Sequence, residues 1–241
     1  GTSKNAIFSF NTKSFHQKLI NKENANHEVL NIMYDSVNRN IIFCSDKIIS
    51  LHDGKKQREY SIAGKAFSPL NKDFTAIAYS SGISIISNSN LKTLIPNWLQ
   101  LPNMTWEGLH YKIEVGSSRG RDVLFDTKSQ TLYGATANGL LYFNPTEKGE
   151  ILFENKKIFA SNLAQCGDHI IAATYTDGLY QIDGKNVLHL NKRNPKISNT
   201  IYKLKCDGDW IWMVGESFIN RYNIKSNVLI EYDYSDGLPK A

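Results

Sequence analysis

Six residues of this 241-residue chain have the chemistry of a sugar-binding surface: Trp98, Trp106, Arg119, Arg121, Tyr175 and Asp177. An aromatic ring offers a flat apolar face, and arginine offers a fork of N–H donors that suits hydroxyl or carboxylate oxygens. A plainer interpretation stays open, in which the tryptophans anchor loops beneath a sheet and the arginines are solvated. The six residues form a ligand site only if the fold brings them together.

Residues suited to catalysis or metal binding are scattered along the sequence. The six histidines show no metal-type spacing, and no Gly-x-Ser-x-Gly elbow or glycine-rich phosphate loop occurs. Glycosidases need two carboxylates facing one cleft. The candidates fall instead at predicted turns, where Asp caps the backbone: Asp126, Asp168, Asp177, Asp207 and Asp209. We therefore expect no catalytic residue, no metal and no cofactor.

The composition limits the classes of partner that the chain can bind. The net charge of +5 is spread over many lysines, and its densest cluster, Lys55, Lys56 and Arg58, is too thin for a nucleic-acid surface. No run of 18 apolar residues occurs, so any membrane attachment must come from segments outside this sequence. We expect no direct nucleic-acid partner.

The three cysteines are odd in number and include no Cys-x-x-Cys pair. This pattern disfavours both a disulfide framework and a zinc site. Cys166 and Cys206 each end a predicted strand, one repeat apart, and are predicted to be small buried apolar side chains.

The chain writes the same hairpin several times. The middle of its first strand falls at Phe43, Ile77, Tyr133, Ile171 and Trp212. Successive hairpins are therefore about 40 residues apart, with one longer step, and this period with strand signals inside each unit is typical of propeller blades of four strands. Apolar residues come in short runs broken by Gly, Asn, Asp and Ser, which excludes a helical repeat.

One unit shows the strands individually. "IYKLKC" (201–206) alternates apolar and polar residues, and "WIWMV" (210–214) is apolar on both faces, as a strand between two neighbouring blades must be. "FINRYN" (218–223) and "VLIEY" (228–232) complete the unit. Gly82, Gly139 and Gly178 precede third strands, where a positive φ is easiest for glycine.

The predicted fold is all-β: a β-propeller of four-stranded antiparallel blades in a single domain or a fragment of one. We place the units at 5–30 (partial), 31–64, 65–95, 119–155, 156–192 and 198–234, with an insertion at 96–118. This makes about five full blades plus a half. Propellers commonly have four to eight blades, so the ring is either short or a piece of a longer array.

In such a ring, the loops between second and third strands gather on one face around the axis, together with the connections between blades. The fold therefore brings Tyr175 and Asp177 to the same face as Ala137 and Asn138, and as Glu216 and Ser217. The insertion is expected to add Trp98, Trp106, Arg119 and Arg121.

Four stretches resemble the two-component regulator propeller repeat. They are "DTKSQTLYGATANGLLYFN" (126–144), "DHIIAATYTDGLYQID" (168–183), "DGDWIWMVGESFINRYN" (207–223) and "YSDGLPKA" (234–241). The resemblance covers roughly residues 120–241, and the two earlier units are degenerate. It implies the periplasmic sensor region of a hybrid two-component receptor, and a fragment of a seven-bladed ring within it. Such a receptor continues into a second propeller, a β-sandwich, a membrane helix, a histidine kinase and a response regulator.

The expected function is therefore non-enzymatic. The resemblance implies an extracytoplasmic sensor module that detects an oligosaccharide and regulates polysaccharide-utilisation genes. It further implies partners in the neighbouring propeller and β-sandwich domains and a homodimeric full-length protein. A free-standing propeller that serves as a protein-interaction platform is the alternative. A propeller lyase or glycosidase is the least favoured, because no acid–base cluster emerges from the sequence.

Overall fold

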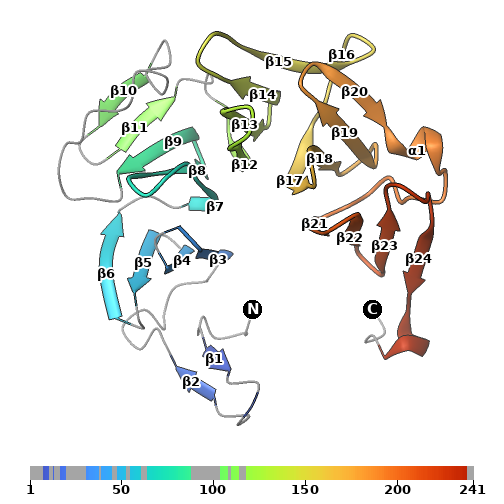
Figure 1. Cartoon of the computed structure of the whole chain (residues 1–241), viewed down its shortest axis with the longest axis horizontal. Coiled ribbons are helices and arrows are strands. Elements are labelled where there is room, and N and C mark those ends of the chain that lie inside the picture. Colours follow the sequence, from blue (N-terminus) through green and yellow to red (C-terminus); the bar gives the residue numbers. More distant parts are fainter. Residues whose placement is uncertain are drawn as a thin grey trace.

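Short strands follow one another along the whole chain in the computed structural model (Figure 1), which describes residues 8–10, 13, 17–19, 31–37, 39–44, 48–52, 55–60, 64–87, 104–107, 110–113 and 118–237. Within these residues, the strands pair antiparallel and form six sheets, of which one is a two-stranded hairpin. The hairpin consists of β1 (Phe8–Phe10) and β2 (Gln17–Leu19).

The other five sheets are the repeat units, which we number as blades 1 to 5 in chain order. Blade 1 contains β3 (Asn31–Asp35), β4 (Asn40–Cys44), β5 (Ile48–His52) and β6 (Lys55–Tyr60). Blade 2 begins with β7 (Gly64–Pro69), β8 (Phe74–Tyr79) and β9 (Gly82–Ser87). Blade 3 contains β12 (Gly120–Asp126), β13 (Thr131–Thr136), β14 (Gly139–Phe143), β15 (Lys148–Phe153) and β16 (Lys156–Lys157).

Blade 4 contains β17 (Ala160–Cys166), β18 (His169–Thr174), β19 (Leu179–Asp183) and β20 (Asn186–His189). A short helix, α1 (Leu190–Arg193), then leads toward blade 5, which contains β21 (Lys203–Asp207), β22 (Trp210–Val214), β23 (Ile219–Asn223) and β24 (Leu229–Tyr232). A single 3₁₀ turn, η3 (Tyr234–Asp236), follows. Five blades and a hairpin confirm the predicted propeller architecture.

The segment 96–118, which is predicted to be an insertion, contains strands of blade 2. Its strands β10 (Met104–Glu107) and β11 (His110–Ile113) extend blade 2, because β11 pairs with β9 and β10 pairs with β11. Blade 2 therefore runs beyond residue 95 and has five strands. The outer strands of blade 2 were not predicted, because the sequence directly after residue 87 lacks an outer-strand pattern. The fourth strand follows only after a long connection.

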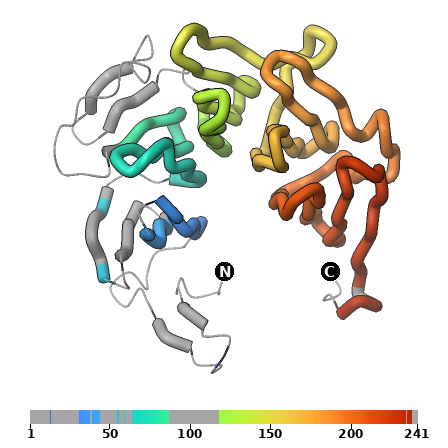
Figure 2. Tube along the Cα trace, viewed as in Figure 1, coloured from blue at the N-terminus to red at the C-terminus, as the bar shows by residue number. Residues whose placement is uncertain are grey.

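The innermost strand of each blade packs against that of the next, in the order β3, β7, β12, β17 and β21. These strands surround a common axis, which is seen end-on in Figure 1, and Figure 2 follows the chain from blade to blade around it. The outer strands lie progressively farther from this axis. All five inner strands therefore bring their first residues to the same rim of the ring.

Each hydrophobic cluster lies between two consecutive blades. In β18, Ile170 and Ala172 join the cluster shared with blade 3, whereas Ile171 and Ala173 join the cluster shared with blade 5. Blades 2 and 3 share a cluster that includes Phe74. A side chain of this size contributes about 1.5 to 3 kcal/mol when it is fully buried. A blade alone would leave one or both of its apolar faces in water.

The prediction for Cys166 and Cys206 as separate apolar side chains is wrong. The two residues form a disulfide between β17 and the end of β21, with their Cα atoms 5.3 Å apart. They end equivalent strands of adjacent blades, and inner-strand packing brings such positions within disulfide range. The number of cysteines did not reveal this pairing. Two residues one repeat apart in the sequence also lie on neighbouring blades.

Gly120 is needed where blade 3 meets blade 2. A Cβ at this position would collide with the carbonyl oxygen of Gly82 and would lie 3.0 Å from the amide nitrogen of Tyr79. Both obstacles are backbone atoms of the β8–β9 turn, so neither can rotate away. By contrast, Gly208 has a φ of +57° and no atom within 4 Å of its added Cβ.

We expect Gly120→Ala to lower the free energy of unfolding by about 3 kcal/mol, the upper end for overpacking. Gly208→Asn is the matched control, since asparagine tolerates a left-handed backbone, and it should change stability by less than about 1 kcal/mol. Urea unfolding measures both. Equal stability of the two variants would contradict the close approach of these blades.

Candidate functional site

A pocket of about 470 Å³ opens on the rim where the inner strands begin. Its size is typical of small-molecule sites. The strand starts contribute Lys65, Arg119, Arg121, Ser161, Tyr202 and Lys203, and the loops between second and third strands contribute Ala137 and Tyr175. Blades 2 to 5 all supply lining residues. The pocket therefore depends on the ring and is not a property of any one blade.

Three lining residues occupy the same kind of backbone irregularity. The pairing of β7 with β8 skips Lys65, the pairing of β12 with β13 skips Arg121, and the pairing of β17 with β18 skips Ser161. Each is the extra residue of a β-bulge at the start of an inner strand. A bulge re-aims its side chain out of the regular alternation. Here the repeated bulge brings side chains from three blades to the pocket.

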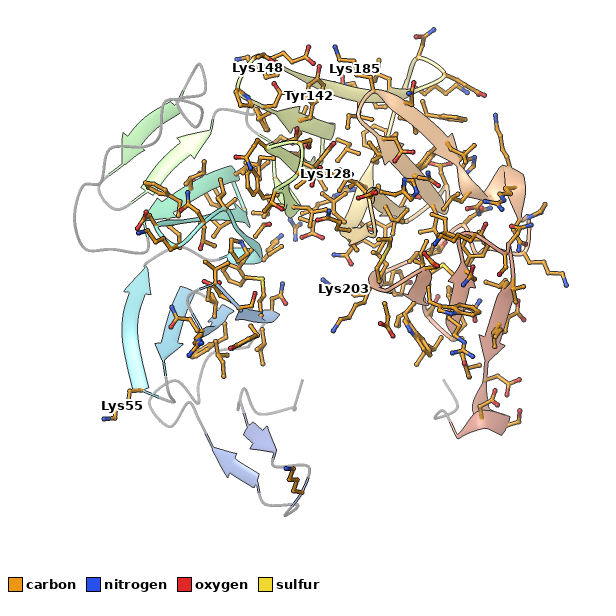
Figure 3. All side chains as sticks on the ribbon, viewed as in Figure 1. Lys55, Lys128, Tyr142, Lys148, Lys185 and Lys203 are labelled. Carbon is orange, nitrogen blue, oxygen red and sulfur yellow. A yellow bond between two sulfur atoms is a disulfide. The ribbon has the colours of Figure 1, made fainter. Side chains whose placement is uncertain are left out.

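The pocket is positively charged. Lys65, Arg119, Arg121 and Lys203 line it, and none of its eight described lining residues is acidic. Burial and the positive charges of Arg119 and Arg121 lower the pKa of Lys65. Burial is the larger cause of this shift, and repulsion from the two neighbouring arginines adds to it. Figure 3 shows Lys203 on the inner side of its blade, whereas Lys148 and Lys185 lie on the outer side of the ring.

Two exposed tyrosines stand beside Arg121. Its guanidinium carbon lies 5.6 Å from the ring centre of Tyr175, a cation–π distance. The Tyr175 ring in turn contacts the Tyr202 ring, with centres 5.9 Å apart and planes tilted by 58°. Tyr175 is 45% exposed and Tyr202 is 39% exposed. The pocket thus offers apolar ring faces next to a forked donor.

Arg121 is held in place by neutral acceptors. Its Nη1 donates to the carbonyl oxygens of Phe159 and Ala160, at 3.3 and 3.4 Å. These long contacts orient the guanidinium toward blade 4 without neutralising it. Most of its hydrogen-bonding capacity therefore remains for a ligand.

A buried network lies next to the pocket and aligns three inner strands. Asp122 Oδ2 accepts hydrogen bonds from the Asn162 side-chain amide and, at 2.7 Å, from the Leu163 amide. Asn162 Oδ1 accepts from the Leu204 amide at 2.9 Å. These bonds join β12 to β17 and β17 to β21. Because Arg121, Ser161 and Lys203 are adjacent in sequence to this network, it positions one pocket residue from each of the three blades.

Asp122 has an unusual acidity. Burial raises the pKa of its carboxyl to about 6, despite the hydrogen bonds from Leu163, Val123 and Asn162 and the positive charge of Lys203, which favour the ionised form. Desolvation therefore outweighs the hydrogen bonds.

The structure brings together three of the six predicted site residues: Arg119, Arg121 and Tyr175. Asp177 shares the loop of Tyr175 but is not among the lining residues, and its carbonyl accepts a hydrogen bond from His189 of the outer strand β20. Trp106 lies in β10, opposite Tyr111, at the outer edge of blade 2. It therefore comes from the edge of the blade farthest from the axis. Trp98 falls outside the described residues.

Sequence reasoning missed Lys65, Ser161, Tyr202 and Lys203. A usable signal exists, because "GKAF" (64–67), "GRDV" (120–123), "ASNL" (160–163) and "YKLK" (202–205) align as first-strand starts. Three of the four second positions in this alignment are cationic. Among the turn aspartates, Asp126 behaves as predicted: its Oδ1 accepts from the Lys128 amide at 3.0 Å and its Oδ2 from the Ser129 hydroxyl at 2.6 Å.

Metal-ligand clusters and membrane-spanning helices are both lacking in the described ranges. No three His, Cys, Asp or Glu side chains there gather as metal ligands would. No helix in that part of the chain has the length and apolar character to cross a bilayer.

Comparison with known proteins supports the fold. No protein-family model and no curated protein matches the chain. A chain in the crystal structure of a mitotic checkpoint complex superposes with a TM-score of 0.65 at 10% identity, over 95% of this chain and 71% of that chain. A chain in a nidogen/laminin complex gives a TM-score of 0.63 at 10% identity, over 95% of this chain and 90% of that chain. At this identity the likeness shows the propeller fold alone.

The raised pKa of Asp122 predicts that the free energy of unfolding depends on pH. The folded state holds its proton more tightly than the unfolded state, so the contribution of Asp122 is largest below pH 3.8 and is lost as pH rises through about 6. The difference between these pKa values corresponds to about 3 kcal/mol. In urea unfolding, the stability of the natural chain relative to Asp122→Asn should fall by about this amount between pH 3.5 and pH 7. A constant difference would show that Asp122 is solvated.

Proposed function

We propose that this chain is a non-enzymatic recognition module that binds an oligosaccharide in the rim pocket. The observation that carries the proposal is the convergence of Arg121, Tyr175 and Tyr202 at one opening. Sugar rings stack on apolar ring faces, and their oxygens accept hydrogen bonds from forked donors. The two exposed tyrosines and the neutrally held guanidinium offer both.

Binding without bond cleavage is favoured by the composition of the pocket. Glycoside hydrolysis uses a pair of carboxyl groups across the scissile bond, and the eight described lining residues include none. The one buried carboxyl nearby, Asp122, is occupied by hydrogen bonds to blade 4. Its role in the geometry is to align strands.

The module belongs, on this proposal, to an extracytoplasmic sensor of a two-component receptor. Its repeat resemblance supports this context, and the disulfide between Cys166 and Cys206 fits the oxidising periplasm. Because the pocket is lined by blades 2 to 5, a bound ligand would tie several blades together. Such a contact can bias a rigid-body rearrangement between neighbouring domains of a dimeric receptor.

A protein-interaction platform is the second candidate. The mitotic checkpoint and nidogen/laminin structures, whose chains are similar in fold, are protein complexes, and propellers of one fold host many roles. On this alternative, the rim would hold an extended peptide in place of a sugar.

Thermal denaturation against a panel of neutral and acidic oligosaccharides tests the proposal. A specific ligand at 100 times its Kd should raise the free energy of unfolding by about 2.7 kcal/mol. Arg121→Ala should abolish the shift. The matched control Lys185→Ala, on the outer side of the ring and paired with Glu147 at 2.9 Å, should retain it. A flat response to every sugar, with binding of a peptide partner, would favour the platform.

A further inference from the structure

The rim pocket is lined by four cationic side chains. Five lysines elsewhere in the described residues are paired with carboxylates: Lys128 with Asp168, Lys157 with Glu150, Lys185 with Glu147, Lys192 with Glu154 and Lys225 with Asp209. Among the described residues, no carboxylate lies within ion-pair distance of the four pocket cations. The positive charge of the pocket is therefore not neutralised by ion pairs with the described residues.

The four cations come from three blades and reach one opening. Lys65 belongs to blade 2, Arg119 and Arg121 to the start of blade 3, and Lys203 to blade 5. Like charges held together repel one another, and this repulsion adds to burial in lowering the pKa of Lys65. An anion in the pocket would relieve this repulsion and satisfy the donors together.

Asp122 provides only a partial counter-charge, through its interaction with Lys203. Its two carboxylate oxygens accept hydrogen bonds from Val123, Asn162 and Leu163, inside the interface of blades 3 and 4. It is 6% exposed. Its hydrogen bonds therefore commit Asp122 to the core, and the described lining of the pocket contains no acidic residue.

We infer that the pocket recognises acidic oligosaccharides, whose carboxylate or sulfate groups bind Arg121, Lys203, Lys65 and Arg119 while a sugar ring lies against Tyr175 and Tyr202. This inference rests on the proposed function and specifies its ligand class. Arginine pairs with carboxylate and sulfate through parallel N–H donors, and lysine adds a point charge. Neutral sugars would leave the four cations without a partner. An acidic sugar would contact both the cations and the tyrosine rings.

The decisive comparison removes the ligand's charge and keeps its shape. Isothermal titration should be performed with trigalacturonic acid and with its fully methyl-esterified form, and a sulfated chondroitin disaccharide distinguishes sulfate from carboxylate. We expect at least one acidic sugar to bind at least tenfold more tightly than the neutral ester, a difference of one charged hydrogen bond. Its affinity should fall as salt rises, since solvent-exposed charges are screened.

Variants assign the effect to the pocket. Lys203→Gln and Lys65→Gln should each weaken the acidic sugar about tenfold and should weaken any binding of the ester less. Lys185→Gln, outside the pocket, should have no effect. Because Lys203 also stabilises the charge of Asp122, circular dichroism of each variant confirms folding, and Lys65→Gln provides an independent test.

The outcomes separate the two claims. Equal binding of acid and ester would overturn the inference and leave the oligosaccharide function standing. Failure of all three sugars, with binding of hexaglutamate, would overturn both in favour of an acidic protein partner. Appearance of an unsaturated sugar product would instead show a lyase. Failure of every probe would reject the inference and remove the support for the pocket as a sugar site.

Discussion

Blades 2, 3 and 4 each bury apolar residues on both faces of the sheet, and this constraint determines the rest of the structure. In β18, adjacent residues Ile170 and Ile171 point into different clusters, one shared with blade 3 and one with blade 5. Such a sheet cannot stand alone in water, because burial of its apolar area is the main favourable term in folding. The available partner is another copy of the same unit. Repetition along the chain thus becomes a ring in space.

The ring turns the inner edge of each sheet toward the axis, and the site is built on that edge. An unpaired edge strand invites pairing with another strand, and bulges and inward charges discourage it. The bulges at Lys65 and Arg121 do this while also aiming two cations at one opening. Protection of the edge and construction of the pocket therefore use the same residues. In a strictly regular inner strand, these side chains would alternate between the two faces of the sheet and point toward the neighbouring blades.

The fold was predictable from the sequence because its determinants are local. Short apolar runs, turn residues and a period near 40 residues report a blade directly, and the positive φ of Gly139 and Gly178 agrees with the turn prediction. The site was only half predictable. Tyr175 followed from its loop, but Lys65 and Lys203 depend on a bulge or on strand phase that no single unit reveals. Trp106 was misplaced because segment 96–118 contains the outer strands of blade 2, and the disulfide was missed because Cys166 and Cys206 meet only when two blades pack.

Asp122 shows how the core and the site constrain each other. A buried carboxylate is unfavourable unless it is hydrogen-bonded, and its raised pKa indicates that three hydrogen bonds and Lys203 compensate only in part. An apolar residue there would remove this penalty but would leave the Leu163 amide and the Asn162 side chain without their acceptor. Those groups set the alignment of β17 against β12 and, through Leu204, of β21 against β17. The chain thus retains a destabilising charge at neutral pH, and that charge keeps the first residues of three strands at one level. Since the pocket consists of those first residues, its geometry depends on a group that no ligand needs to touch.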